Sequence, residues 1–316
     1  MKTKELEIDY IKWFPLLTVI LLTLVLSLIN PDFISLYNIK SLLTQTSVLV
    51  ILSCGMTFVL LTGGIDLSIG SIVSCSGVIV AVALPNYGYW AYFFGLLFGA
   101  GAGFFNGIIV AKGKAPSFIV TLASGGIWLS LAYVCSQGRP VPVPTDLTYY
   151  RSWIISETLG LPNVTLITIA LIVFGIFILQ KTTIGRYIYA MGNGERATML
   201  SGVNVQSVRI KVFMLNGLFA AVGGILLFGR LASGTPTVGN SYLLPVITSV
   251  VVGGTAITGG FGGIPRTVLG AFIITLLNNG MNVIGIDAFA QQIVMGAILI
   301  VCVTINLDRK KLLVLK

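Results

Sequence analysis

Apolar segments follow one another along almost the whole chain. A segment of about 20 apolar residues is typical of a helix that crosses the hydrocarbon core of a bilayer. We count ten candidate spans, of which the third and eighth are short enough to be tilted, broken or re-entrant. They cover approximately residues 14–30, 42–62, 69–84, 89–111, 117–136, 163–180, 212–230, 243–258, 267–285 and 289–306. The sequence therefore predicts an all-α integral membrane protein, with residues 1–316 forming one transmembrane domain.

The distribution of cations predicts the orientation of these spans. Lys and Arg accumulate on the cytoplasmic side of membrane proteins. If the N-terminus is cytoplasmic, only four of the nineteen cations fall outside, namely Lys40, Arg139, Arg151 and Arg230. Residues 1–13, 181–211 and 307–316 are then cytoplasmic, and residues 137–162 form the largest outer loop. Both termini lie inside because the number of spans is even.

Composition excludes several classes of function. The chain contains no histidine and its four cysteines lack metal-like spacing, so we expect no metal and no cofactor. No Walker A sequence is present, so ATP hydrolysis requires a separate subunit and the chain itself is not an enzyme. The net charge of +9 comes from cations between spans rather than from a basic patch, which argues against a nucleic-acid partner and for contact with membrane lipid.

Glycine is frequent and patterned. Gly95, Gly99 and Gly103 recur at every fourth position of the fourth span, a spacing that favours close packing of helices. Two further glycine-rich stretches, 62–71 and 253–263, lie at the ends of spans and lack the ending of a phosphate-binding loop. We expect them to break helices, so that free backbone groups line a cavity or a hinge.

Uncharged polar residues supply a candidate translocation pathway. Most buried amides form hydrogen bonds between helices, but a minority face a pore that passes a polyhydroxy solute. Asp66 is the only acid near the interior of a span. It either caps the short third span or touches the solute during passage, and both roles remain open. The candidate pathway residues are Asp66, Asn106, Asn278, Asn279 and Gln292.

Four motifs resemble those of one family. They are Gly-Gly-Ile-Asp-Leu-Ser-Ile-Gly-Ser at 63–71, Ile-Gly-Arg-Tyr-Ile-Tyr-Ala-Met-Gly-Asn at 184–193 with the residues up to 203, Val-Gly-Gly-Thr at 252–255 with Gly259 and Gly260, and Leu-Leu-Asn-Asn-Gly at 276–280. In order and spacing the chain resembles the membrane permeases of ribose-type sugar ABC importers from about residue 30 to 308. The chain departs modestly from the pattern at residues 191–194 and 261–263.

The resemblance implies a bacterial inner-membrane permease that works as a dimer, either of two copies or with a close paralogue. It implies two cytoplasmic ATPase subunits, an extracytoplasmic sugar-binding protein and two groups of spans, 2–5 and 7–10, of inverted topology. Within the loop 181–211, Asn193 or Gly194 starts a short helix that Gly202 ends. This helix fits a groove on an ATPase subunit. The candidate coupling residues are Gly192, Asn193, Glu195, Arg196, Ala197, Leu200 and Gly202.

In the outer loop, Arg139 and Arg151 are the candidate residues for docking the binding protein, and alternate prolines between 140 and 144 favour an extended backbone. The leading function is the permease subunit of an importer for a monosaccharide such as ribose. The same architecture serves nucleosides, autoinducer-like furanoses or branched-chain amino acids. A secondary carrier is disfavoured because the spans lack internal charge, and an intramembrane enzyme is disfavoured because no buried lysine or histidine is available.

Overall fold

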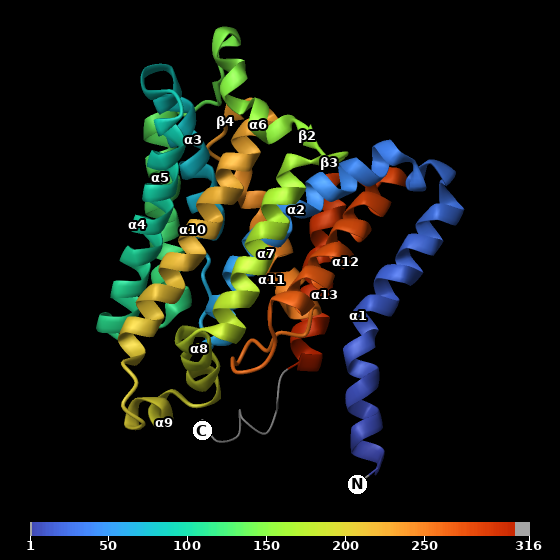
Figure 1. Cartoon of the computed structure of the whole chain (residues 1–316), viewed down its shortest axis with the longest axis vertical. Coiled ribbons are helices and arrows are strands. Elements are labelled where there is room, and N and C mark those ends of the chain that lie inside the picture. Colours follow the sequence, from blue (N-terminus) through green and yellow to red (C-terminus); the bar gives the residue numbers. More distant parts are fainter. Residues whose placement is uncertain (1, 307–316) are drawn as a thin grey trace.

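The computed structural model describes residues 2–306, and the predicted cytoplasmic tail 307–316 lies outside the described residues. The described chain is a bundle of long helices, with short helices, short strands and loops at its two opposite ends (Figure 1). The helices that overlap the candidate spans are α1 (Lys2–Ile29), α2 (Leu36–Leu61), α3 (Ile69–Tyr87), α4 (Trp90–Gly113), α5 (Ser117–Ser136), α7 (Asn163–Lys181), α10 (Val205–Leu231), α11 (Leu243–Val252), α12 (Ile264–Val283) and α13 (Ala288–Asn306). Each candidate span corresponds to one of these helices.

Six helices within the described residues are long and apolar enough to cross a membrane by length and composition: α2, α3, α4, α5, α7 and α10. The third candidate span is thus longer than predicted. The eighth, α11, is shorter than the predicted 243–258, because the backbone turns at Gly253-Gly254, where Gly254 has φ +85°.

Helices α2 and α10 form the centre of the bundle, since 78% of the most apolar window of each is buried, against 28% for α5 and α7. The predicted glycine face of α4 is confirmed. A Cβ atom at Gly99 would collide with Ala221, and one at Gly103 would collide with the backbone of Phe213. Because lipid is as apolar as a leucine side chain, such close backbone contact is a main source of helix association in a membrane.

Loop 137–162 is ordered by short elements: β1 (Val141–Pro142), η2 (Thr145–Arg151), α6 (Ser152–Ile155), β2 (Glu157–Thr158) and β3 (Leu161–Pro162). Strand β1 is extended, as the proline pattern predicts, and pairs antiparallel with β4 (Ser233–Gly234); β2 pairs with β3. Two 3₁₀ helices, η1 (Pro31–Ile34) and η3 (Val238–Tyr242), precede α2 and α11. Lys40 at the start of α2 forms an ion pair with Glu157, which ties this loop to the bundle.

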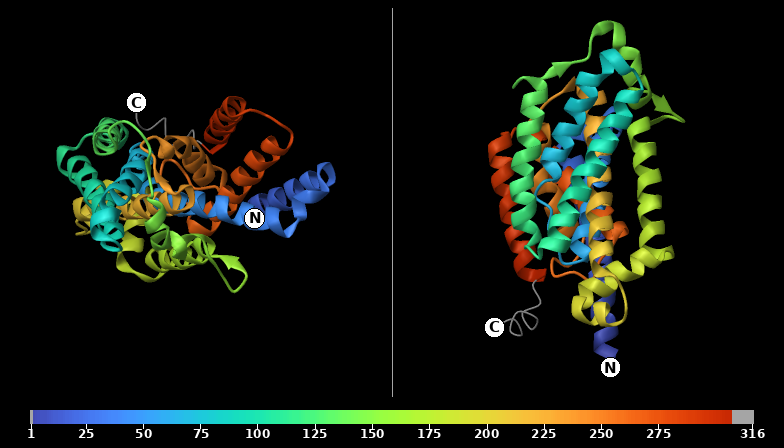
Figure 2. Two further views of the ribbon diagram at one scale, coloured as in Figure 1. Left: turned by 90° about the horizontal axis from the view of Figure 1, so that it is seen from above. Right: turned by 90° about the vertical axis from the view of Figure 1, so that its left-hand side faces the viewer.

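Residues 181–211 carry two helices, α8 (Thr183–Asn193) and α9 (Glu195–Leu200), before α10 begins. The right-hand view of Figure 2 shows α8 and α9 at the end of the bundle opposite to the ordered loop 137–162. The two longest loops of the predicted topology therefore lie at opposite ends of the molecule.

Candidate functional site

The glycine-rich stretch after α2 forms a break in the bundle. Between Leu61 and Ile69 the chain is not α-helical, and Gly63 adopts φ +76°, a left-handed conformation that favours glycine. Side chains of α5 satisfy the free backbone groups: Ser117 Oγ accepts from Ile65 N at 3.0 Å, and Thr121 Oγ1 accepts from Leu67 N at 2.9 Å. Irregular backbone inside a membrane protein is tolerated when its polar groups are satisfied in this way.

Asp66 lies at the centre of this break and is fully buried. Its Oδ1 accepts from the backbone N of Ser68 at 2.9 Å and from Ser68 Oγ at 2.6 Å. Its Oδ2 accepts from Asn216 Nδ2 on α10 at 2.9 Å. Asn106 on α4 in turn donates to Ser68 Oγ at 2.8 Å. Four buried polar residues thus join the break to two long helices.

Of these four residues, Asp66 and Asn106 are among the predicted pathway residues, whereas Ser68 and Asn216 are not. Asn216 is the single polar side chain between residues 212 and 229, and that isolation is the signal that points to it. Within the described residues the Oδ1 atoms of Asn106 and Asn216 are buried without a hydrogen-bond partner. The cluster therefore retains unused acceptors, which a change of rotamer or a solute hydroxyl would satisfy.

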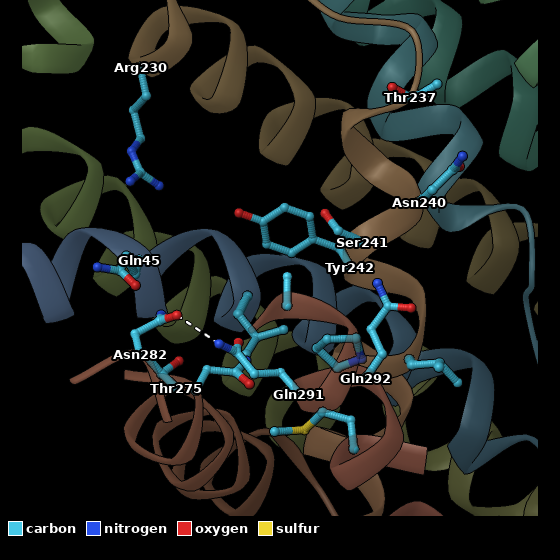
Figure 3. Close-up of a pocket in the computed structure, with 16 residues that line it drawn as sticks. Gln45, Arg230, Thr237, Asn240, Ser241, Tyr242, Thr275, Asn282, Gln291 and Gln292 are labelled. Atoms are coloured by element: carbon cyan, nitrogen blue, oxygen red, sulfur yellow. Dashed lines mark hydrogen bonds between the residues drawn. The ribbon is translucent and has the colours of Figure 1, made fainter. Parts of the chain in front are cut away.

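A second polar region is an open cavity of about 660 Å³ between α2, η3, α12 and α13 (Figure 3). It contains the predicted pathway residues Asn278 and Gln292. Asn279 is not among its lining residues; it is buried, with its Oδ1 unpartnered within the described chain. The cavity carries six amide side chains: Gln45, Asn240, Asn278, Asn282, Gln291 and Gln292.

The cavity and the Asp66 cluster lie near opposite ends of α2. Gln45 lies in the first half of α2 and lines the cavity, whereas Asp66 follows the last residue of that helix. The 16 residue steps from Gln45 to Leu61 span about 24 Å at 1.5 Å per step. The predicted pathway residues are therefore not one site but two separate polar regions.

Helix α8 packs against both glycine-rich breaks. A Cβ atom at Gly192 would collide with the carbonyl oxygen of Leu61 and with Gly260 N, so only glycine fits there. Asn193 Nδ2 donates to the carbonyl oxygens of Tyr189, at 2.9 Å, and of Gly260, at 3.4 Å. Three of the four sequence motifs thus meet at the end of the bundle that carries α8.

Tyr189 adds a further contact, because its hydroxyl donates to the carbonyl oxygen of Gly262 at 3.0 Å. Burial raises the pKa of the Tyr189 phenol, and the nearby Arg266 partly opposes this. The phenol therefore remains a hydrogen-bond donor. Together with Gly192 and Asn193 it fixes α8 to the turn that follows α11.

Helix α9 begins after Gly194 and ends at Leu200, and Gly202 follows with φ +84°. The predicted bounds of this helix are confirmed. Glu195 forms an ion pair with Arg209 at 2.6 Å on the first turns of α10. Arg196 and Ala197 are exposed, and Leu200 is 78% exposed. The helix thus presents a small apolar surface with charges at its start, away from the bundle.

The two arginines predicted to dock the binding protein differ in environment. Arg139 is exposed at the start of loop 137–162. Arg151 is partly buried, and its Nη1 donates to the carbonyl oxygen of Gly229 in the last turn of α10 at 3.0 Å. Arg151 therefore also caps the C-terminal end of a central helix, where a cation is favoured.

The chain combines a bundle of long apolar helices with a polar cavity, and α8 and α9 are attached at one end of the bundle. This combination is typical of a multi-pass membrane permease. The family described as "Branched-chain amino acid transport system / permease component" matches residues 38–303, and the chain belongs to this family. It is the permease component of an ABC importer in the cytoplasmic membrane.

Three relatives show how much of the chain is shared. The ribose import permease protein RbsC of Haemophilus influenzae is 40% identical over 306 residues, which cover 94% of each chain. RbsC of Escherichia coli K12 is 38% identical over 94% of this chain and 93% of its own. The L-arabinose transport system permease protein AraH of Escherichia coli K12 is 36% identical over 89% and 86%.

A solved structure supports the fold. The structure of a metal-chelate type ABC transporter in an inward-facing conformation aligns with a TM-score of 0.51 over 98% of this chain and 99% of its own, at 15% identity. At this identity the likeness concerns the fold alone. The sequence-based prediction of a helical ABC-type permease is thereby confirmed at the level of fold and family.

Proposed function

We propose that this chain forms the translocation pathway of an importer for a monosaccharide such as ribose. The observation that carries the proposal is the cavity of about 660 Å³ with six neutral amides and no acid among its lining residues. Amides supply both donors and acceptors, which match the hydroxyl groups of a sugar. The names of the relatives, which concern ribose and L-arabinose, agree with this chemistry.

The proposed topology has ten crossings, with both termini in the cytoplasm. Residues 1–13 and 181–211 face the cytoplasm, residues 137–162 face outward, and spans 2–5 and 7–10 form two groups of inverted topology. The opposite placement of α9 and the outer loop in Figure 2 supports this orientation. The two groups begin with α2 and α10. These helices have similar lengths of 26 and 27 residues and are equally buried, which supports the division into two groups.

The proposed partners are two cytoplasmic ATPase subunits, an extracytoplasmic sugar-binding protein and a second permease copy or close paralogue. The coupling surface is α9 with the residues on either side: Gly192, Asn193, Glu195, Arg196, Ala197, Leu200 and Gly202. The exposed Ala197 and Leu200 support this assignment, because apolar side chains on a short polar segment in water fit the groove of a partner.

Transport is tested by reconstituting the chain with its ATPase and binding-protein partners in proteoliposomes. We expect ATP-dependent uptake of labelled ribose. Unlabelled ribose should inhibit this uptake more strongly than leucine or a nucleoside does. Preferred uptake of leucine would assign the substrate named in the family description instead. Uptake without any ATPase subunit would contradict the importer mechanism.

Coupling is tested by Ala197→Arg, which places a long charged side chain on the exposed surface of α9. We expect normal insertion and folding but loss of substrate-stimulated ATP hydrolysis. Gly113→Arg is the matched control, because Gly113 is exposed at the end of α4 with only an ordinary contact to Ile109. Unchanged stimulation in Ala197→Arg would remove α9 from the coupling surface.

A further inference from the structure

Arg230 is the one charged side chain among the residues that line the cavity of about 660 Å³. It belongs to the last turn of α10, and its side chain extends toward Gln45 and the hydroxyl side of Tyr242 (Figure 3). Within the described residues no carboxylate lies within ion-pair distance of it. Asp287, in the turn before α13, does not line the cavity; its Oδ1 accepts from the backbone N atoms of Phe289 and Ala290.

The guanidinium of Arg230 is hardly used by the protein. Its Nη1 donates to the carbonyl oxygen of Thr44 at 3.5 Å, the limit of a hydrogen bond. A guanidinium has five N–H donors, so most of them are free for a ligand. A cation at a helix C-terminus is also favoured by the helix dipole, but Arg151 already serves this end of α10 through Gly229. The dipole alone therefore does not explain why a second arginine points into the cavity.

The neutral groups of the cavity are also available. In the described part of the chain, the side-chain amides of Asn240, Asn278 and Gln292 form no hydrogen bond, whereas Gln291 donates to Asn282 at 2.7 Å. Free amides beside an unpaired guanidinium match a ligand that presents many acceptor oxygens and hydroxyl groups. The same guanidinium repels any ligand that carries a positive charge.

We propose that this cavity is a solute-binding site of the permease itself, which takes uncharged polyhydroxylated solutes, and that Arg230 excludes cationic solutes from it. The sugar-binding part of the proposal rests on the proposed function. The charge selection does not, since it follows from the unpaired guanidinium in the cavity. The two parts are therefore tested separately.

Charge selection is measured by labelling a cysteine placed in the cavity. Ser241→Cys changes one atom of an exposed cavity residue, and Cys135→Ser with Cys302→Ser removes the partly accessible native thiols. The full chain in nanodiscs is labelled with sulfonatoethyl methanethiosulfonate, an anion, and with its trimethylammonioethyl counterpart, a cation. With Arg230 present we expect the anionic reagent to be favoured; Arg230→Gln should lower the anion-to-cation rate ratio about tenfold, the effect of one unit charge at close range in a partly hydrated site.

Two controls make the result specific. Arg230→Lys keeps the charge and should keep the ratio. Leu159→Cys, whose parent side chain is 92% exposed on the outer loop, should give a ratio that Arg230→Gln does not change. The proposed charge selection would be overturned if the anion-to-cation rate ratio at Ser241→Cys were the same with Arg230 and with Arg230→Gln. Both proteins must have the same melting temperature for this comparison.

Solute binding is measured by protection of the same cysteine. We expect ribose and ribitol to slow labelling by a neutral methanethiosulfonate in a saturable way, and glucosamine, a cation, to protect much less. Arg230→Gln should reduce this difference between ribitol and glucosamine. If no neutral polyol protects the cysteine, the proposed binding site is overturned. The result on charge selection would not be affected. Because labelling requires neither ATPase nor transport, a failure of the importer function would not be mistaken for either result.

Discussion

Asp66 Oδ2 accepts a hydrogen bond of 2.9 Å from Asn216 Nδ2, which joins two residues 150 positions apart in the sequence. One lies in the break between α2 and α3, and the other lies in the buried middle of α10. Since α10 follows directly on α9, this bond and the Glu195–Arg209 ion pair attach both the break and the proposed coupling helix to the same central helix.

We predict that Asp66→Ala and Asp66→Asn differ strongly. The alanine leaves the Asn216 amide and the Ser68 N–H buried without an acceptor, at a cost of about 1–3 kcal/mol for each group. Asp66→Asn keeps one acceptor, and a flipped Asn216 would offer its unused Oδ1 to the new amide donor. We expect lower folded yield and melting temperature for the alanine variant and a mild effect for the asparagine variant.

Transport per folded molecule completes this experiment. If the surviving Asp66→Ala molecules transport at the normal rate, Asp66 is structural. If folded yield is normal in both variants and transport falls in both, Asp66 belongs to the pathway or its gate.

The face of α4 provides a second prediction. Gly103→Val should lower the melting temperature markedly, because its side chain would collide with the backbone of α10, and overpacking of this kind costs about 1–3 kcal/mol or more. Gly101→Val is the matched control, since nothing lies within 4 Å of a Cβ atom at Gly101. Equal melting temperatures of the two variants in detergent would contradict the tight packing of α4 on α10.

A third prediction concerns the attachment of α8. Gly192→Ala would push a methyl group into Leu61 and Gly260, so we expect reduced stability and weaker substrate-stimulated ATP hydrolysis in the assembled transporter. At Gly194 the nearest atom to an added Cβ is Ala197 Cβ at 3.8 Å, and the backbone is extended, so Gly194→Ala should behave like the parent chain. Normal coupling in Gly192→Ala would show that the contact of α8 with the breaks is dispensable.

The outer arginines should separate docking from folding. Arg139→Glu should weaken association with the binding protein in a salt-dependent manner without changing the melting temperature, because Arg139 is exposed. Arg151→Glu should also lower the melting temperature, because it removes the hydrogen bond to Gly229 and places a negative charge at the end of α10. Affinity that is insensitive to both reversals and to salt would place docking elsewhere.

The sequence was sufficient for the helices and for local signals. Each apolar segment overlaps one helix of the described chain, the four-residue glycine spacing predicts the packing of α4, and Gly194 and Gly202 bound α9 as expected. These features depend on residues close together in the chain. The expected break at the glycine-rich stretch 253–263 is also present, since α11 ends at Val252, but the apolar run alone had extended this span to residue 258.

Pairings over long distances were not predictable in this way. Nothing in the spans themselves indicates that Asn216 meets Asp66, or that Arg230 and Gln291 open into one cavity, since these contacts depend on how the helices cross. The division of the pathway residues into two regions has the same origin. Hydropathy predicts which residues belong to a membrane span but not which of them face each other.

The contact of Gly192 with Leu61 and Gly260 has a consequence for how partners are exchanged. Helix α8 carries the fixed contacts to the bundle, while α9 contributes mainly Thr198 to the interior and turns most other side chains outward. The contacts that attach α8 to the bundle and the proposed coupling surface on α9 thus belong to adjacent but different helices. Under the proposed coupling role of α9, exposed side chains such as Ala197 and Leu200 can be replaced to fit another ATPase partner, while the contacts of Gly192 with the bundle stay unchanged.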